Sequence, residues 1–438
     1  MRFAPNSAHN LQTVSAINYG PSTVASAAIG SATTTKLLFR HPFLIGGGDV
    51  SSITLSNLAW YLQKNVGVTA LGNGFVIDSC AIEYNGAHQN VTFGGLRNKA
   101  INAGDTDIQA DPLSASAFGL SAFTQGSIGY IRCQLSFSTP ATDQFPQNSY
   151  RHSSDTIPAV LFDPNKVSVT NGVDATGPIT YSMINSGVDG TDAVHQTNFY
   201  TPIVLGNFVQ PGRFATFFMA GDSIMAGFQD NTGNSMAASG YTRAMFPRGI
   251  GSSVNVLACL NFACPGGIGS DWANGTPAKI LAYLKYAKYG IEAYGANNPT
   301  VSFSTAIHAQ MRAGGIVGIY RISITPSDTS SDSFTTAGGQ TYASGYGPGG
   351  GMATFNTAMQ ALVASDFTWV DPLGMRDGGG SGDYWKWFTN GTALYAVGSD
   401  GLHPSSNGYE LEVGGSATVI SNSGTATNNM RQLFASLT

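Results

Sequence analysis

Residues 1 to about 212 contain many short apolar segments, each bounded by Gly, Asn, Asp or Pro. Residues 130–137 illustrate the pattern, because one face of this segment is apolar and the other is mixed, as in a half-buried strand. Short strands at turn-punctuated intervals are typical of sandwiches and jelly rolls. A short helix is expected only near residues 55–63. Strands are predicted at 36–40, 74–84, 90–93, 129–138, 159–162 and 179–183.

The pattern changes from residue 213 onward. Residues 214–220 and 254–260 are continuous apolar runs, which are typical of buried parallel strands. Strands that alternate with helices predict βαβ units and a mainly parallel sheet in a three-layer α/β/α domain. Helices are expected at 277–288, 305–312 and 353–364, and further strands at 289–294, 316–325 and 367–370. We therefore predict an all-β sandwich or jelly-roll domain over 1–212 and an α/β domain over 213–438.

A long Ser-, Thr- and Gly-rich stretch at 327–351 interrupts the second pattern. A loop of this length usually has a function or is mobile.

Composition excludes several classes of protein. The chain has 438 residues, of which only 10% are charged, and a formal net charge of −5, so it lacks the basic footprint of a nucleic-acid-binding protein. A hydrophobic content of 42% excludes disorder driven by charge. No apolar run reaches the roughly 18 residues that a membrane-spanning helix needs.

The polar surface must come largely from Ser, Thr, Asn and Gly, since 55 residues are Gly and Lys and Glu are scarce. This composition is common in extracellular and virion-borne proteins. The first ten residues lack the order of a signal peptide. We therefore expect a secreted or virion-associated protein whose leader is absent from this chain.

The four cysteines form no CxxC pair and no Cys/His cluster with zinc spacing, so no metal site is predicted. Buried thiols are favoured over one or two disulfides. The residues concerned are Cys80, Cys133, Cys259 and Cys264.

In an open α/β sheet, ligand sites form at the carboxyl ends of the strands. The first apolar run ends at Gly221-Asp222-Ser223. A serine at this strand-to-helix turn lies where amide groups favour a developing negative charge. The same tripeptide is also an ordinary turn sequence.

The next two strand ends carry candidate hydrogen-bond donors. Gly266 and Gly267 follow Pro265, and a glycine lets the backbone N–H approach a ligand, although Pro-Gly is also a common turn. The side chain of Asn297 can donate a further hydrogen bond, or it can form an Asx turn.

Near the C-terminus, Asp400 precedes His403 by three residues, and Pro404 stiffens the turn. A serine nucleophile needs a base, and the base needs an acid on its other ring nitrogen. Of the seven histidines, His403 alone has a close upstream carboxylate in such a setting. His308 lies in a helical segment and is expected to pack or to face solvent.

The motifs just described form four blocks, around Ser223, Gly266, Asn297 and His403. They occur in the order and context of the GDSL, or SGNH, hydrolases, which the chain resembles over about residues 213–438. The resemblance implies a flavodoxin-like α/β/α fold in which Ser223 is the nucleophile and His403 and Asp400 complete the triad. It implies that the amides of Ser223 and Gly266 and the side chain of Asn297 form the oxyanion hole. It implies no cofactor and no metal.

Two features depart from the family pattern or leave a choice open. The third block usually reads Gly-x-Asn-Asp, and Asn298 replaces its last residue here. Gly267 competes with Gly266 for the second block. Segments 91–95, 101–104, 109–112 and 128–137 resemble the β region that precedes the GDS motif in many secreted bacterial members.

The expected function is that of a serine esterase acting on short-chain, O-acetyl esters of a carbohydrate. Loops rich in aromatic residues suit sugar binding, although two of the tryptophans can instead cover the domain edge. These aromatic residues are Tyr342, Tyr346, Tyr384, Trp385 and Trp387. The alternatives are a lipase or acylhydrolase acting on longer acyl esters, or a phage virion or surface glycan-binding protein with receptor-deacetylase activity.

Overall fold

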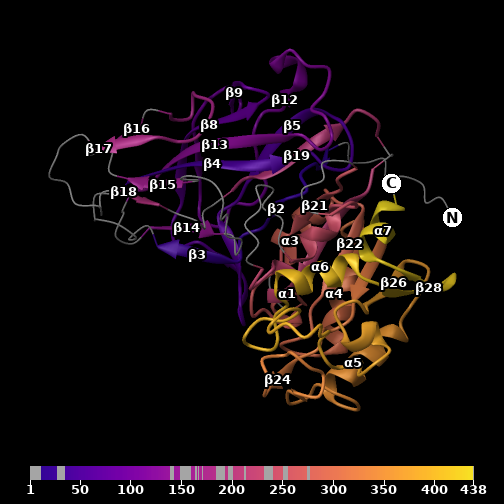
Figure 1. The fold of residues 1–438 in the computed structure, drawn as a ribbon. Helices are drawn as coiled ribbons and strands as arrows, with labels where there is room; N and C mark the ends of the chain where they lie inside the picture. Colours follow the sequence, from indigo (N-terminus) through magenta and orange to yellow (C-terminus); the bar gives the residue numbers. More distant parts are fainter. Residues whose placement is uncertain are drawn as a thin grey trace.

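The computed structural model describes most of the chain and shows two parts side by side (Figure 1). A β-rich part is drawn in indigo to magenta, and a part with helices and strands mainly in rose through orange to yellow. No helix in the described part of the chain is long and apolar enough to cross a membrane. The described residues are 11–26, 35–138, 143–147, 159–162, 165, 167–169, 171–183, 193–195, 201–211, 214–230, 240–249, 255–273 and 277–437.

The β-rich part is built mainly from two antiparallel sheets. One has the order β1-β19-β5-β11, with β12 also on β5, and the other β10-β8-β13-β4-β15-β18, with β9 also on β8. Both sheets contribute to one hydrophobic core, in which Phe39, Ile53 and Ile77 are fully buried. The elements are β1 (Leu11–Thr13), β3 (Thr23–Ser26), β4 (Lys36–Leu44), β5 (Val50–Asn57), β6 (Trp60–Gln63), β7 (Gly67–Ala70), β8 (Phe75–Tyr84), β9 (Ala87–Val91), β10 (Lys99–Ile101), β11 (Ile108–Gln109), β12 (Leu113–Ser114), η1 (Ala115–Phe118), β13 (Ile128–Ser136), β14 (Gln144–Gln147), β15 (Ala159–Phe162), β16 (Val167–Val169), β17 (Tyr181–Met183), β18 (Ala193–His195) and β19 (Ile203–Phe208).

The other part is organised around a sheet with the order β2-β21-β20-β22-β23-β26-β27-β28. Neighbouring strands from β2 to β26 are parallel, and β27 and β28 extend the sheet in antiparallel fashion. The elements are β2 (Asn18–Tyr19), β20 (Thr216–Gly221), α1 (Ser223–Ala226), η2 (Gly240–Met245), β21 (Ala258–Asn261), α2 (Gly269–Ala273), α3 (Pro277–Leu284), β22 (Tyr289–Ala293), α4 (Val301–Ala313), β23 (Gly318–Ile322), β24 (Asp328–Ser330), β25 (Gln340–Tyr342), α5 (Gly351–Gln360), β26 (Phe367–Pro372), η3 (Asp377–Gly380), α6 (Ser406–Gly414), β27 (Ala417–Ser421), β28 (Gly424–Asn428) and α7 (Met430–Ala435).

Strand β20 is buried on both faces, as its continuous apolar sequence predicts. Phe217 and Met219 belong to a core that includes side chains of α1, α6 and α7. Phe218 and Ala220 belong to a second core, which includes side chains of α2, α3, α4 and α5. Ser223 therefore follows a strand that is held from both sides.

The β-rich part also contributes directly to the second part. Strand β2 pairs in parallel with β21, next to β20. The β6–β7 hairpin places the fully buried Trp60 against Phe262 and Tyr283, with ring centroids 5.6 and 6.2 Å away. A domain boundary near residue 212 stays a prediction.

The prediction of a helix near residues 55–63 is wrong. This segment contains the end of β5 and the whole of β6. Strand β5 pairs with β19 and β6 with β7, so hydrogen bonds between strands satisfy the backbone in place of helical ones.

The cysteine prediction is half wrong. Cys80 and Cys133 form a disulfide, because they lie opposite each other on β8 and β13 with their Cα atoms 4.2 Å apart. Such a cross-strand register cannot be read from the spacing of cysteines in the sequence. Cys259 and Cys264 are buried free thiols, as expected.

Candidate active site

Ser223, His403 and Asp400 form a continuous hydrogen-bonded chain. Ser223 is the first residue of α1, immediately after β20, and the other two residues lie on the loop before α6. His403 Nε2 lies 2.7 Å from Ser223 Oγ, and His403 Nδ1 lies 2.6 Å from Asp400 Oδ2. With the ring proton on Nδ1, Nδ1–H donates a hydrogen bond to the Asp400 carboxylate, and Nε2 accepts one from the serine hydroxyl.

The Asp400 carboxylate is held in its charged form. Burial acts to raise its pKa, but hydrogen bonds from the His403 amide and side chain and from the Leu402 amide lower that pKa below its ordinary value. Both amides lie 3.0 Å from Asp400 Oδ1. A charged carboxylate can therefore stabilise an imidazolium at His403.

Asp222, immediately before the serine, has a different environment. It is fully buried and caps α1 by accepting a hydrogen bond of 3.0 Å from the Ile224 amide. Burial raises its pKa to about 7, against the lowering effects of that hydrogen bond and of the nearby Arg321. Asp222 thus shapes the turn that presents Ser223.

The choice between Gly266 and Gly267 can be examined from their hydrogen bonds. The Gly267 amide donates to the Cys264 carbonyl at 2.8 Å, and the Gly267 carbonyl accepts from Asn297 Nδ2 at 3.0 Å. Within the described part of the chain, no group accepts a hydrogen bond from the Gly266 amide. The Gly266 amide is therefore the one available to a ligand, and Asn297 is tied to the same turn.

A lysine from the β-rich part lies beside this turn. A methyl group added to Gly266 would lie 2.8 Å from Lys64 Cδ and 3.2 Å from Lys64 Nζ. The tip of the β6–β7 hairpin is fixed by the Asn65 amide, which donates to Asp271 Oδ2 at 3.0 Å. A cation from a distant part of the sequence is thus placed next to a candidate oxyanion donor.

A buried ion-pair network lies near the carboxyl ends of β22 and β23. Arg321 Nε is 3.0 Å from Glu292 Oε2, and His308 Nε2 is 3.3 Å from the same oxygen. Burial acts to raise the Glu292 pKa, but Arg321 and His308 lower it below its ordinary value. His308 is buried, so of the two expected locations the structure shows the packed one.

Aromatic residues near the site differ sharply in exposure. Trp385 and Trp387 are buried, so neither presents an open ring face to a sugar. Trp387 Nε1 instead donates to the Gly401 carbonyl at 3.0 Å, within the loop that carries Asp400 and His403. Phe228 is 50% exposed, and its ring centroid lies 4.7 Å from that of His403.

Several residues around the site were not singled out from the sequence. Lys64 and Gln229 belong to no motif, and Gln229 donates to Asp400 Oδ2 at 2.7 Å. Tyr346, expected only as one of several loop aromatics, donates to the Ala296 carbonyl at 3.1 Å, next to Asn297. Only the folded arrangement brings these side chains to the strand ends.

No family model matches the chain, and no curated protein matches it. Solved structures that are similar to it at low identity include the following three. A lipase from a goat rumen metagenome is 13% identical with a TM-score of 0.32, over 45% of this chain and 93% of that chain. A family two carbohydrate esterase from Cellvibrio japonicus is 11% identical with a TM-score of 0.27, over 92% of each chain. An extracellular lipase from Streptomyces rimosus is 12% identical with a TM-score of 0.25, over 45% of this chain and 96% of that chain.

These three proteins are described as lipases or esterases. A likeness at these TM-scores is too slight to define the fold or the activity of this chain.

Proposed function

We propose that this protein is a serine ester hydrolase in which Ser223, His403 and Asp400 form the catalytic triad. The observation that carries the proposal is the chain of two hydrogen bonds, 2.7 Å from Ser223 to His403 and 2.6 Å from His403 to Asp400. These residues are 180 and 3 positions apart in the sequence, so only the fold brings the serine to the histidine. A nucleophile, a base and an orienting acid in this order are what acyl transfer requires.

In the proposed reaction, Ser223 Oγ attacks the ester carbonyl while His403 Nε2 takes the hydroxyl proton. The tetrahedral intermediate collapses when His403 passes this proton to the leaving alcohol, which yields an acyl-enzyme on Ser223. Water then attacks the acyl carbonyl with His403 as its base, and the acid is released. Asp400 keeps the ring oriented and stabilises the imidazolium in each step.

The oxyanion of the intermediate would be stabilised by the amides of Ser223 and Gly266 and by the side chain of Asn297. The free Gly266 amide and the anchoring of Asn297 on Gly267 support this assignment. Donors fixed before the reaction stabilise developing charge without reorganisation. The chemistry needs no metal and no organic cofactor.

The proposed catalytic unit is a three-layer SGNH-type domain over residues 213–438, beside a sandwich or jelly-roll domain over residues 1–212. The parallel sheet with apolar cores on both faces supports the first assignment. The second is supported by the two antiparallel sheets that share one core. A secreted or virion-associated location accompanies this proposal.

The proposed substrate is a short acyl ester, O-acetyl on a carbohydrate. The exposed ring of Phe228 beside His403 supports this choice, since sugars stack on aromatic faces. The same ring suits a longer acyl chain, so a lipase is the competing function. A series of p-nitrophenyl esters separates them: an optimum at acetate supports the proposal, and an optimum beyond about eight carbons identifies a lipase.

The activity itself is tested with Ser223→Ala. Wild type is expected to hydrolyse p-nitrophenyl acetate, and the variant is expected to lose turnover while its circular dichroism spectrum and melting temperature stay the same. Turnover by Ser223→Ala at the wild-type rate would refute the assignment. Acetate release from acetylated polysaccharides, with the variant as the blank, then identifies the alcohol side.

A further inference from the structure

Within the described residues, the Asp400 carboxylate receives one hydrogen bond from outside its own loop. Its Oδ1 accepts the amides of Leu402 and His403, and its Oδ2 accepts His403 Nδ1 at 2.6 Å. The fourth donor is Gln229 Nε2, 2.7 Å from Oδ2. Gln229 lies in the segment that follows the nucleophile, so this bond joins the two halves of the proposed triad directly.

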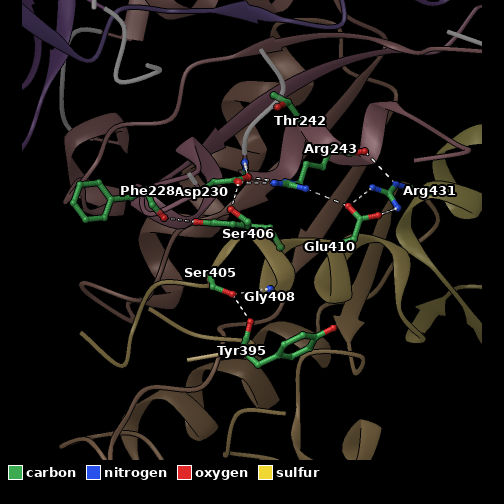
Figure 2. A network of polar contacts seen from close by, with 12 residues as sticks. Phe228, Asp230, Thr242, Arg243, Tyr395, Ser405, Ser406, Gly408, Glu410 and Arg431 are labelled. Carbon is green, nitrogen blue, oxygen red and sulfur yellow. Dashed lines mark hydrogen bonds and ion pairs between the residues drawn. The ribbon is translucent and has the colours of Figure 1, made fainter. Parts of the chain in front are cut away.

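The backbone around Gln229 is held in an uncommon conformation. Its φ is +65°, which few residues other than glycine adopt. The neighbouring residues are fixed on both sides: the Phe228 carbonyl accepts the Tyr409 hydroxyl at 3.0 Å, and Asp230 accepts Ser406 Oγ at 3.0 Å (Figure 2). Such a conformation persists where the surroundings impose it, and it is concentrated at functional sites.

Asp230 is the anchor of a larger network. Its side chain is fully buried and pairs with Arg243 Nε at 2.6 Å. Arg243 also contacts Glu410 at 3.2 Å, and Glu410 pairs with Arg431 Nη2 at 2.8 Å (Figure 2). This network ties residues 228–230 to α6 and α7. Because α6 begins just after His403, the network fixes the segment of Gln229 relative to the histidine loop.

Gly398 leaves space for the Gln229 amide group. A Cβ atom at position 398 would lie 1.5 Å from Gln229 Oε1, so no larger residue fits without displacing the glutamine. The Gly398 amide donates to the His403 carbonyl at 2.8 Å. Gln229 Oε1 therefore packs against the loop that carries the proposed base, while its Nε2 points to Asp400.

Gln229 also lines a cavity next to the histidine loop. The Asp400 side chain is 36% exposed, and an open cavity of about 360 Å³ is lined by Gln229, Gly398 and Ser399. Water can replace the hydrogen bond of the glutamine amide, but it does not fix the plane of the carboxylate.

We propose that Gln229 is a positioning residue of the active site, which holds the Asp400 carboxylate in the orientation that receives His403 Nδ1–H. The inference rests on the proposed function. Gln229 does not touch the reacting atoms; it acts through Asp400. It couples the nucleophile segment to the acid–base loop, so that neither moves without the other.

The first test replaces the donor while the shape is kept. Gln229→Met removes the carboxamide, and kcat for p-nitrophenyl acetate is expected to fall about tenfold to hundredfold, by analogy with the loss of a residue that orients a metal ligand. KM is expected to stay unchanged. Gln360→Met, on the exposed end of α5, is the matched control and should retain wild-type kcat. A wild-type kcat for Gln229→Met, or a rise in KM alone, would overturn the proposal.

The second test uses pH. Gln229→Glu places a carboxylate beside Asp400, which favours the protonated form of His403. The acidic limb of the kcat/KM profile is therefore expected to move to higher pH. A side chain at position 229 that lies away from Asp400 would leave this limb in place, so an unmoved limb in a folded Gln229→Glu variant counts against the proposal.

The third test needs no variant of the glutamine alone. Gly398→Ala drives the Gln229 side chain from its place and is expected to lower kcat to a similar extent. Adding Gln229→Met to Gly398→Ala should cost little more, since both changes remove one hydrogen bond. Fully additive losses would show that the two residues act separately.

Two further measurements keep this proposal distinct from the proposed function. If Ser223→Ala is inactive and Gln229→Met is fully active, only the role of Gln229 fails. If wild type hydrolyses none of the esters, the His403 Nδ1 proton is followed by NMR. Its downfield resonance is expected to shift or to exchange faster in Gln229→Met, and an unchanged resonance would refute the proposal.

Discussion

Replacing Gly401 with alanine is expected to disrupt the loop that carries Asp400 and His403. Gly401 has a φ of +72°, and an added Cβ would lie 1.9 Å from the Asp328 carbonyl oxygen, whereas ordinary contact begins at 3.4 Å. The loop would therefore have to move by about 1.5 Å. A movement of this size breaks the hydrogen bonds of 3.0 Å that the Gly401 carbonyl accepts from the Asp328 amide and from Trp387 Nε1.

The magnitude follows from these contacts. A left-handed conformation costs an alanine about 1–2 kcal/mol, and each lost hydrogen bond costs about 0.5–1.5 kcal/mol. We expect Gly401→Ala to lower the free energy of unfolding by about 2–5 kcal/mol. Because a misplacement of about 1 Å can reduce turnover about hundredfold, kcat is expected to fall by at least that factor.

Gly391→Ala provides a matched control. Gly391 also has a left-handed φ, of +84°, but no atom lies within 4 Å of an added Cβ. The free energy of unfolding of this variant should fall only by the cost of the left-handed conformation, and its kcat should equal that of wild type. Guanidinium chloride titration and p-nitrophenyl acetate hydrolysis measure both quantities. Equal stability and equal turnover of the two variants would refute the steric argument.

Three further predictions concern single groups. Asn297→Ala should cost about 2.7–4 kcal/mol of transition-state stabilisation, as the loss of an oxyanion donor does, and an unchanged kcat would exclude that role. Burial raises the pKa of Glu412 from 4.5 to about 8, so the stability conferred by its proton is lost as pH rises through this window. Glu412→Gln cannot ionise and should gain stability relative to wild type by up to about 1.4 kcal/mol per pH unit there, measured by denaturation at several pH values; parallel curves would contradict this. Replacing Cys80 and Cys133 with alanine should lower the free energy of unfolding by about 2–4 kcal/mol, and reductant should have the same effect on wild type but none on the variant.

Local patterns in the sequence predict much of the parallel sheet. The apolar run at 214–220 overlaps β20, Thr216–Gly221, because a strand covered on both faces needs apolar residues at every position. Strand β26, Phe367–Pro372, and helix α5, Gly351–Gln360, also lie close to their predicted ranges. The strands β27 and β28 were not predicted; β28 is mostly exposed and lacks an apolar pattern.

Pairs of residues that depend on tertiary contact could not be predicted in the same way. His403 and Ser223 carry local motifs, and the structure places them 2.7 Å apart. Lys64 and Gln229 belong to no local motif. A hairpin of the β-rich part places Lys64 at the site, and a left-handed backbone conformation orients Gln229. The Cys80–Cys133 pairing likewise depends on strand register. The roles of Ser223, His403 and Gln229 in catalysis stay predictions.

The placement of β2 determines when the sheet can be completed during synthesis. Asn18 of β2 pairs with Leu260 of β21, and Thr13 Oγ1 donates to the Cys259 carbonyl 246 positions later. At about 5–20 residues per second, the nascent chain must keep its first segment unpaired for on the order of tens of seconds. Contacts between such distant segments also slow folding. We therefore expect β2 to stay unpaired until β21 has been made, and the nascent protein to be prone to aggregation at this strand during that time.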